Sequence, residues 1–132
     1  MVLLAVIGAF INTWQTAHDA SVLADRDLQA EEYAASYITE HITQRDTIVS
    51  TAPVDIQTAY YLKINGVPFE RFYNRDHPVQ IQNALVLLRK NGRYNTPESV
   101  LDFYHLSDDL NLEATELVYE YGQVQVYSVP AK

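Results

Sequence analysis

Thr47-Ile48-Val49-Ser50-Thr51 is a mostly β-branched run that leads into Ala52-Pro53-Val54-Asp55, and residues 56–64 then repeat apolar side chains at helical spacing. β-Branched residues favour strands, and a strand that passes into a helix at a proline is typical of α/β sheets. In such sheets, ligands bind beyond the carboxyl ends of the strands. The segment therefore predicts a central strand, a crossover helix and a ligand site close to their junction.

Length, charge and cysteine content limit the classes of protein to consider. A chain of 132 residues that is 48% hydrophobic has enough apolar side chains for one core, so we expect one domain. Its formal net charge of -8 opposes nucleic-acid phosphates, and no basic patch offsets that charge, so we expect no nucleic-acid partner. The absence of cysteine excludes disulfides and thiol chemistry but leaves the cellular compartment open.

Periodicity predicts the other elements of a domain over residues 27–130. A helix from Asp27 places an apolar stripe against the sheet and Glu31 and Glu32 on a solvated face. Val67 to Tyr73 alternates as a second strand, and Ala84 to Leu88 is apolar enough for a central strand covered on both faces.

The C-terminal half adds a helix and a hairpin. Thr96-Pro97-Glu98-Ser99 is a strong helix start, with Thr96 as the N-cap and proline in the first turn. Glu116 to Glu120 and Gln123 to Val129 alternate about Gly122 and predict an antiparallel hairpin. The predicted fold is a small three-layer α/β sandwich, whose mixed sheet combines parallel strands with a C-terminal antiparallel hairpin.

The N-terminal segment differs from the rest of the chain. Met1 to Ile11 is apolar and uncharged, but it has about half of the roughly 20 residues that a membrane-spanning helix needs. It is the end of a longer membrane helix, a buried helix of the domain, or a signal peptide. Trp14 resembles an interfacial anchor, and the first basic residue is Arg26, which favours an anchor with the downstream domain outside the cytoplasm. We therefore divide the chain into residues 1–14, which are the end of a membrane helix or an apolar N-terminal helix, a connector over 15–26 and a single α/β domain over 27–130.

Three candidate binding residues lie around the predicted crossover helix. Asp55 is placed to cap this helix, and its alternative role is a carboxylate that faces a ligand at the strand end. Tyr60 and Tyr61 are adjacent, so one ring faces the core and the other is available to a cleft, although core packing suits either.

The polar loop 74–78 completes the candidate site. Arg71, Arg75, Asp76 and His77 supply donors and acceptors that suit a phosphate or sugar hydroxyls. The alternative interpretation is an exposed turn with a salt-bridged pair.

The chain carries none of the searched catalytic or metal-binding signatures. Dinucleotide-binding, P-loop, zinc-protease and serine-hydrolase patterns do not occur. His105, Asp108 and Asp109 have the composition of a metal site, but a histidine favoured by the dipole in the last helical turn and a solvated acidic loop explain them better. We expect no cofactor and no metal in this chain.

Several short motifs, in this order, carry a resemblance to a known family. They are Ala30-Glu31-Glu32-Tyr33-Ala34 with Tyr37-Ile38, Asp46-Thr47-Ile48-Val49, Ala59-Tyr60-Tyr61-Leu62, Thr96-Pro97-Glu98-Ser99-Val100-Leu101, and Glu120-Tyr121-Gly122 with Val126-Tyr127. Over Asp27 to Val129 the chain resembles the C-terminal soluble domain of multi-spanning membrane glycosyltransferases. That family is related to dolichyl-phosphate-mannose protein mannosyltransferases and lipid-linked sugar transferases.

The resemblance implies an extracytoplasmic domain of an enzyme that transfers a sugar from a polyprenyl-phosphate donor. In that family the catalytic acidic residue lies in an early loop between membrane helices, so this chain is expected to be non-catalytic by itself. Its implied partners are the membrane-embedded remainder of the enzyme and a glycan or peptide acceptor. Two alternatives stay open: a free-standing small α/β protein that binds a sugar or phosphate, and a protein-protein interaction module.

Overall fold

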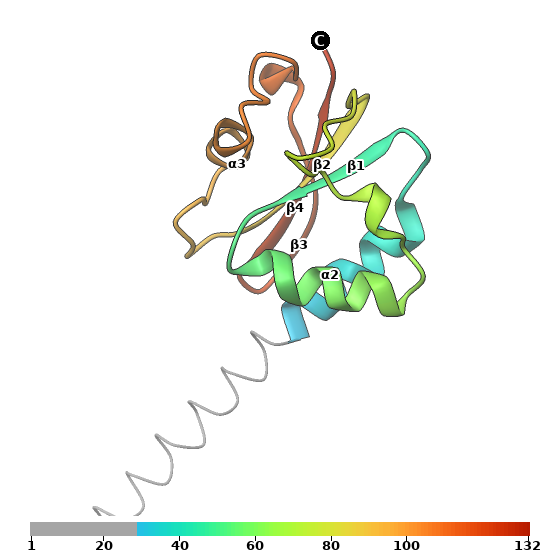
Figure 1. The fold of residues 1–132 in the computed structure, drawn as a ribbon. Coiled ribbons are helices and arrows are strands. Elements are labelled where there is room, and N and C mark those ends of the chain that lie inside the picture. The colour runs from blue at the N-terminus through green and yellow to red at the C-terminus, as the bar shows by residue number, and fades with distance from the viewer. Residues whose placement is uncertain (1–28) are drawn as a thin grey trace, which may run out of the picture.

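Four strands form one mixed sheet in the order β1-β2-β4-β3 (Figure 1). The computed structural model describes residues 29–132, so the predicted segments 1–14 and 15–26 lie outside the described residues. The strands are β1 (Asp46–Ser50), β2 (Asn83–Arg89), β3 (Glu116–Tyr121) and β4 (Val124–Pro130). β1 and β2 are parallel, whereas β4 is antiparallel to both β2 and β3. The predicted mixed sheet with a C-terminal hairpin is confirmed.

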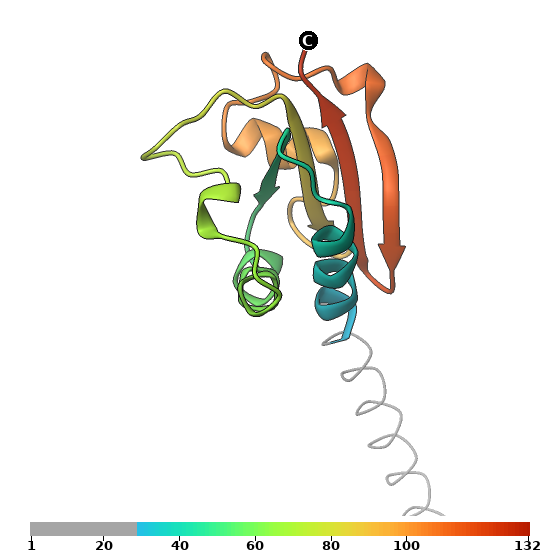
Figure 2. The same ribbon diagram turned by 90° about the vertical axis from the view of Figure 1, so that its right-hand side faces the viewer.

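Helices cover both faces of this sheet, which gives the predicted three layers (Figures 1 and 2). Helical residues 29–41 and α2 (Val54–Ile64) pack on one face, and α3 (Pro97–Phe103) packs on the other. Alternation along β2 sends Leu85 and Leu87 into the first core and Val86 and Leu88 into the second. β2 is therefore the central strand buried on both sides, as its apolar sequence predicts.

The junction of β1 and α2 follows the prediction except at Asp55. α2 begins at Val54, directly after a cis Ala52–Pro53 peptide bond, and Pro53 already has near-helical dihedral angles. Asp55 is therefore the second residue of the helix and not its cap, and its Oδ1 accepts a 2.8 Å hydrogen bond from the Ile56 amide. The predicted cap is wrong, but the carboxylate still lies in the first turn, where the helix dipole favours it.

The predicted strand from Val67 to Tyr73 is also wrong. Its centre is the 3-10 turn η1 (Phe69–Arg71), in which the amides of Arg71 and Phe72 donate to the carbonyls of Pro68 and Phe69. Pro68 has no amide hydrogen to give to a ladder, so its neighbourhood forms a turn. Only the end of the segment reaches the sheet, where Phe72 forms a parallel bridge with Ile48 at the outer edge of β1.

Glu31 is buried rather than solvated, which corrects the predicted polar face of the first helix. The residue has no exposed surface, and its Oε1 lies 2.5 Å from Nη1 of Arg89 at the end of β2. Glu32 is exposed, as predicted. A buried carboxylate needs such a partner, and the partner is 58 positions away in the sequence, where local periodicity gives no sign of it.

Thr96 caps α3, as the sequence predicts. Its side chain accepts from the Ser99 amide at 3.1 Å, and the Ser99 side chain accepts in return from the Thr96 amide. This reciprocal pair fixes the start of α3. The helix ends at Phe103. The next residue, Tyr104, reaches the carboxyl end of β1, where its hydroxyl donates to the Ser50 carbonyl.

Candidate functional site

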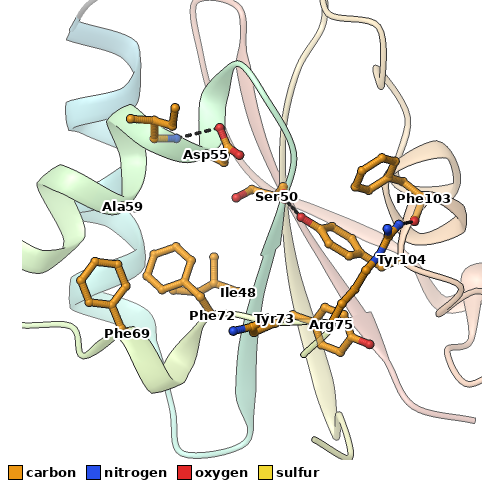
Figure 3. A pocket seen from close by; sticks show the side chains of 12 residues that line it. Ile48, Ser50, Asp55, Ala59, Phe69, Phe72, Tyr73, Arg75, Phe103 and Tyr104 are labelled. Carbon is orange, nitrogen blue, oxygen red and sulfur yellow. Dashed lines mark hydrogen bonds between the residues drawn. The ribbon is translucent and has the colours of Figure 1, made fainter. Parts of the chain in front are cut away.

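An open cleft of about 440 Å³ lies at the carboxyl end and outer edge of β1 (Figure 3). Its walls come from β1, the first turns of α2, the segment from η1 to the following loop, and the end of α3. The residues that line it are Ile48, Ser50, Asp55, Ile56, Ala59, Phe69, Phe72, Tyr73, Asn74, Arg75, Phe103 and Tyr104. The cleft therefore occupies the strand-to-helix junction at which the sequence predicts a ligand site.

Aromatic rings form much of the cleft wall. Tyr73 and Tyr104 meet edge to face with ring centroids 5.3 Å apart, and Phe103 contacts Tyr104 in the same way at 4.9 Å. On the other side, the rings of Phe69 and Phe72 are 6.1 Å apart. These separations lie in the range that aromatic pairs favour, so neighbouring rings hold one another in place.

Arg75 joins the loop after η1 to the end of α3. Its Nη2 donates to the Phe103 carbonyl, and its guanidinium carbon lies 4.5 Å from the Phe103 ring centroid and 5.3 Å from that of Tyr104. A guanidinium at this distance is attracted to the ring faces. Arg75 thereby closes one side of the cleft and places a positive charge in its wall.

Tyr104 connects the cleft to the sheet. Its hydroxyl donates a 2.6 Å hydrogen bond to the Ser50 carbonyl at the end of β1. Burial raises the pKa of this hydroxyl, the Asp55 carboxylate raises it further, and the Arg75 guanidinium opposes the shift. Tyr104 therefore keeps its proton at neutral pH and acts as a donor.

Removing the Tyr104 hydroxyl tests this connection. Tyr104→Phe should lower the free energy of unfolding at pH 7 by about 0.5–1.5 kcal/mol, the usual net value of one hydrogen bond. Because folding raises the pKa, the unfolded chain loses this proton first as the pH rises past about 10, and the folded state loses stability there. Urea unfolding across this pH range should show a smaller decrease in the free energy of unfolding at alkaline pH in Tyr104→Phe than in the wild type.

The alkaline loss should be reduced and not abolished, because burial also raises the pKa of Tyr119. Equal stability and an equal alkaline loss in both proteins would assign the Tyr104 hydroxyl no structural role.

Two of the seven residues predicted from the sequence line the cleft, namely Asp55 and Arg75. They come from α2 and from the loop after η1. Both act on the Tyr104 hydroxyl, with opposite effects on its pKa. The fold thus brings a carboxylate and a guanidinium into one aromatic cleft.

The other five predicted residues lie outside this lining. Tyr60 is 62% exposed on α2, and Tyr61 packs against the first core. Arg71 donates through Nη2 to the Thr43 carbonyl and borders a second, smaller hollow near the turn before β1. Asp76 and His77 are exposed in the loop.

Sequence reasoning did not identify the aromatic wall. Phe69, Phe72 and Tyr73 fall in the segment predicted to be a strand, and Phe103 and Tyr104 follow the predicted start of a helix at Thr96. The available signal was the repeated aromatic residues in Pro68 to Tyr73 and the pair Phe103-Tyr104. Without the fold, nothing shows that these two groups face one another.

No three His, Cys, Asp or Glu side chains in residues 29–132 gather to hold a metal ion. Within the same part of the chain, every helix is too short or too polar to cross a bilayer. Comparison of the chain with protein-family models, curated proteins and solved structures found no match.

Proposed function

We propose that this chain is a non-catalytic recognition domain that binds a carbohydrate in the β1 cleft. We further propose that it is the extracytoplasmic domain of a membrane glycosyltransferase that uses a polyprenyl-phosphate sugar donor. The residues that line the cleft support the proposal of carbohydrate binding. The family resemblance supports the proposal of a membrane glycosyltransferase. A free-standing sugar-binding protein would use the same cleft.

The observation that carries the binding proposal is the combination of aromatic rings with polar groups of both signs. Ligand sites are mostly apolar and aromatic, with a few polar groups that set orientation. The C–H faces of a sugar ring suit aromatic walls such as Tyr73 and Phe72, while sugar hydroxyls donate to a carboxylate and accept from a guanidinium. Asp55, Asn74 and Arg75 supply these polar contacts. The cleft therefore fits a neutral sugar better than an apolar ligand.

A recognition role fits the ionisable groups better than a catalytic one. Asp55 is the only carboxylate among the described residues that line the cleft, and one of its oxygens accepts from the Ile56 amide. General acid-base catalysis needs a group within reach of the reacting oxygen and with a suitably tuned pKa. In the resembled family that group lies in a membrane loop. We therefore propose that this domain holds the acceptor glycan while the rest of the enzyme carries out the transfer.

Asp55→Asn tests the proposed sugar contact. The amide oxygen can still accept from the Ile56 amide, so the fold should be retained, but the charged acceptor for a sugar hydroxyl is lost. Hydrogen bonds to charged groups contribute about 1.5–3 kcal/mol, so affinity should fall by about tenfold or more. The measurement is an NMR titration of the full chain with mannose oligosaccharides, followed at the amides of Phe72, Tyr73 and Asn74.

Asp76→Asn is the matched control. It removes the same charge from an exposed residue that follows Arg75 in the loop but does not line the cleft. Its affinity for the oligosaccharide should equal that of the wild type. Inorganic phosphate is the second probe. Saturable chemical-shift changes with phosphate but not with the oligosaccharide would show that the cleft binds an anion at Arg75 and not a carbohydrate. Unchanged affinity in Asp55→Asn would assign Asp55 to structure alone.

Deletion of Met1 to Ile11 tests the proposed anchor. If this segment belongs to a membrane helix, its removal should improve solubility and leave the thermal midpoint nearly unchanged. Calorimetry of the two proteins provides the measurement. A drop of more than about 5 °C, which corresponds to roughly 1 kcal/mol in a domain of this size, would show instead that the segment is part of the core.

A further inference from the structure

α2 carries apolar side chains on its outer face as well as on its inner one. Val54, Thr58 and Leu62 are buried against the sheet. The α2 stripe, defined as Ile56, Tyr60 and Ile64, is 76%, 62% and 62% exposed. A spacing of four residues puts these three side chains on one helix face. A surface helix normally presents polar residues there, so the stripe needs an explanation outside the core.

The apolar surface continues beyond the helix into η1, where the charged Glu70 beside Phe69 is also exposed. Phe69 in η1 is 59% exposed, and the ammonium of Lys63 lies 5.4 Å from its ring centroid. Asp55 and Lys63 are the charged residues of α2, in a chain with a net charge of -8. Contiguous exposed apolar surface of this kind marks a site of interaction with a protein or a membrane.

The stripe lies at the end of the domain where the described chain begins. In both views α2 and the blue start of the helix over residues 29–41 lie at the same end of the domain, and the C-terminus is at the opposite end (Figures 1 and 2). Met1 to Ile11 is the most apolar run of the sequence, and 17 residues, numbers 12–28, separate it from the described domain. Fully extended, a link of that length reaches about 60 Å at most, so the domain stays within that distance of the point where the run is inserted.

We propose that the α2 stripe lies against the interfacial region of the bilayer that holds the apolar N-terminal segment. Isoleucine side chains suit the headgroup and acyl boundary, and a tyrosine ring suits the headgroup level. Lys63 can extend its charge to water past the Phe69 ring. Because the chain is tethered, the effective concentration of the stripe at the bilayer is high, and a weak contact is sufficient. An acidic chain is repelled by anionic lipids, so a zwitterionic surface is the expected partner.

This position would also orient the cleft. Ile56 and Phe69 belong both to the exposed apolar surface and to the cleft lining. A domain resting on its α2 stripe would therefore hold the mouth of the cleft beside the membrane surface. The inference rests on the proposed function for the membrane anchor only, and it does not depend on sugar binding.

The absence of cysteine allows a direct test with single fluorescent labels. Tyr60→Cys and Ile64→Cys variants of the 132-residue chain, labelled with an environment-sensitive fluorophore, are mixed with phosphatidylcholine vesicles that contain lipids with a quencher near the headgroup. Leu117→Cys is the matched control, because this side chain is a 45% exposed leucine on β3, which lies at the edge of the sheet opposite β1. We expect a blue shift and loss of most emission at positions 60 and 64, and neither change at 117.

Flotation of the vesicles separates the two hypotheses. If the chain floats but labels at 60 and 64 behave like the label at 117, the inference is wrong and the anchor stands. If the chain does not float, neither the apolar run nor the α2 stripe holds it at this bilayer, and the inference is wrong. A blue shift at 60 that rises with protein concentration in the absence of vesicles would assign the stripe to a second copy of the chain and overturn the inference.

Discussion

Replacing Arg89 by methionine should lower the free energy of unfolding by about 3–5 kcal/mol, the cost of leaving a buried charge without its partner. Glu31 has no exposed surface, its Oε1 lies 2.5 Å from Arg89 Nη1, and its Oε2 has no hydrogen-bond partner among the described residues. Methionine fills a similar volume but cannot compensate the carboxylate. Urea unfolding of both proteins at pH 7 is the measurement.

Lys90→Met is the control, since it breaks an ion pair with Glu120 in which both side chains are about 40% exposed. Such surface pairs contribute little to stability, because solvent screens them. The double variant Glu31→Leu with Arg89→Met should recover most of the loss, because buried ion pairs can be replaced by apolar side chains of similar volume. A loss in Arg89→Met no larger than that in Lys90→Met would show that Glu31 is effectively solvated.

Replacing Leu87 by alanine should cost about 2–5 kcal/mol, the range observed when a large buried side chain leaves a cavity. Leu87 is fully buried in β2, where it pairs with Ser50 of β1 and Val126 of β4 and joins the core beneath α2. Both neighbouring strands are held by the sheet, so they cannot collapse into the space. Urea denaturation measures the loss.

Ile64→Ala is the matched control for this core prediction. Ile64 is 62% exposed on α2, so its truncation should change stability by no more than about 0.5 kcal/mol, as is usual at the surface. If the two truncations have equal effects, β2 is not the centre of the core. A large loss in Ile64→Ala alone would mean that the α2 stripe is covered in solution.

Local periodicity was sufficient for the elements whose signal lies within a few residues. The run from Ala84 to Leu88 predicts a strand covered on both faces, and β2 is that strand. The cap at Thr96 and the hairpin about Gly122 are likewise present where the sequence places them. These features depend on intrinsic residue preferences and on side-chain alternation, both of which act over short distances along the chain.

Local signals failed where two of them competed. Alternating side chains from Val67 to Tyr73 predict a strand, but Pro68 cannot donate to a ladder and the segment forms η1 instead. Asp55 has the right chemistry for a cap, yet Pro53 starts the helix early. In both places a proline, with its fixed φ and missing amide hydrogen, determines the local backbone and overrides the preferences of the neighbouring residues.

The sequence alone determined the buried central strand β2, the strand-to-helix junction that carries Asp55, and the order of the helices and the four strands, except that it also predicted a strand over Val67 to Tyr73. Only the tertiary structure determined which residues distant in the sequence each side chain contacts. It pairs Glu31 with Arg89 across 58 positions, and it assembles one cleft from η1, the loop with Arg75 and the end of α3. The reason is physical: strand and helix preferences come from neighbouring residues, whereas a cleft and a buried ion pair exist only after distant segments have packed together.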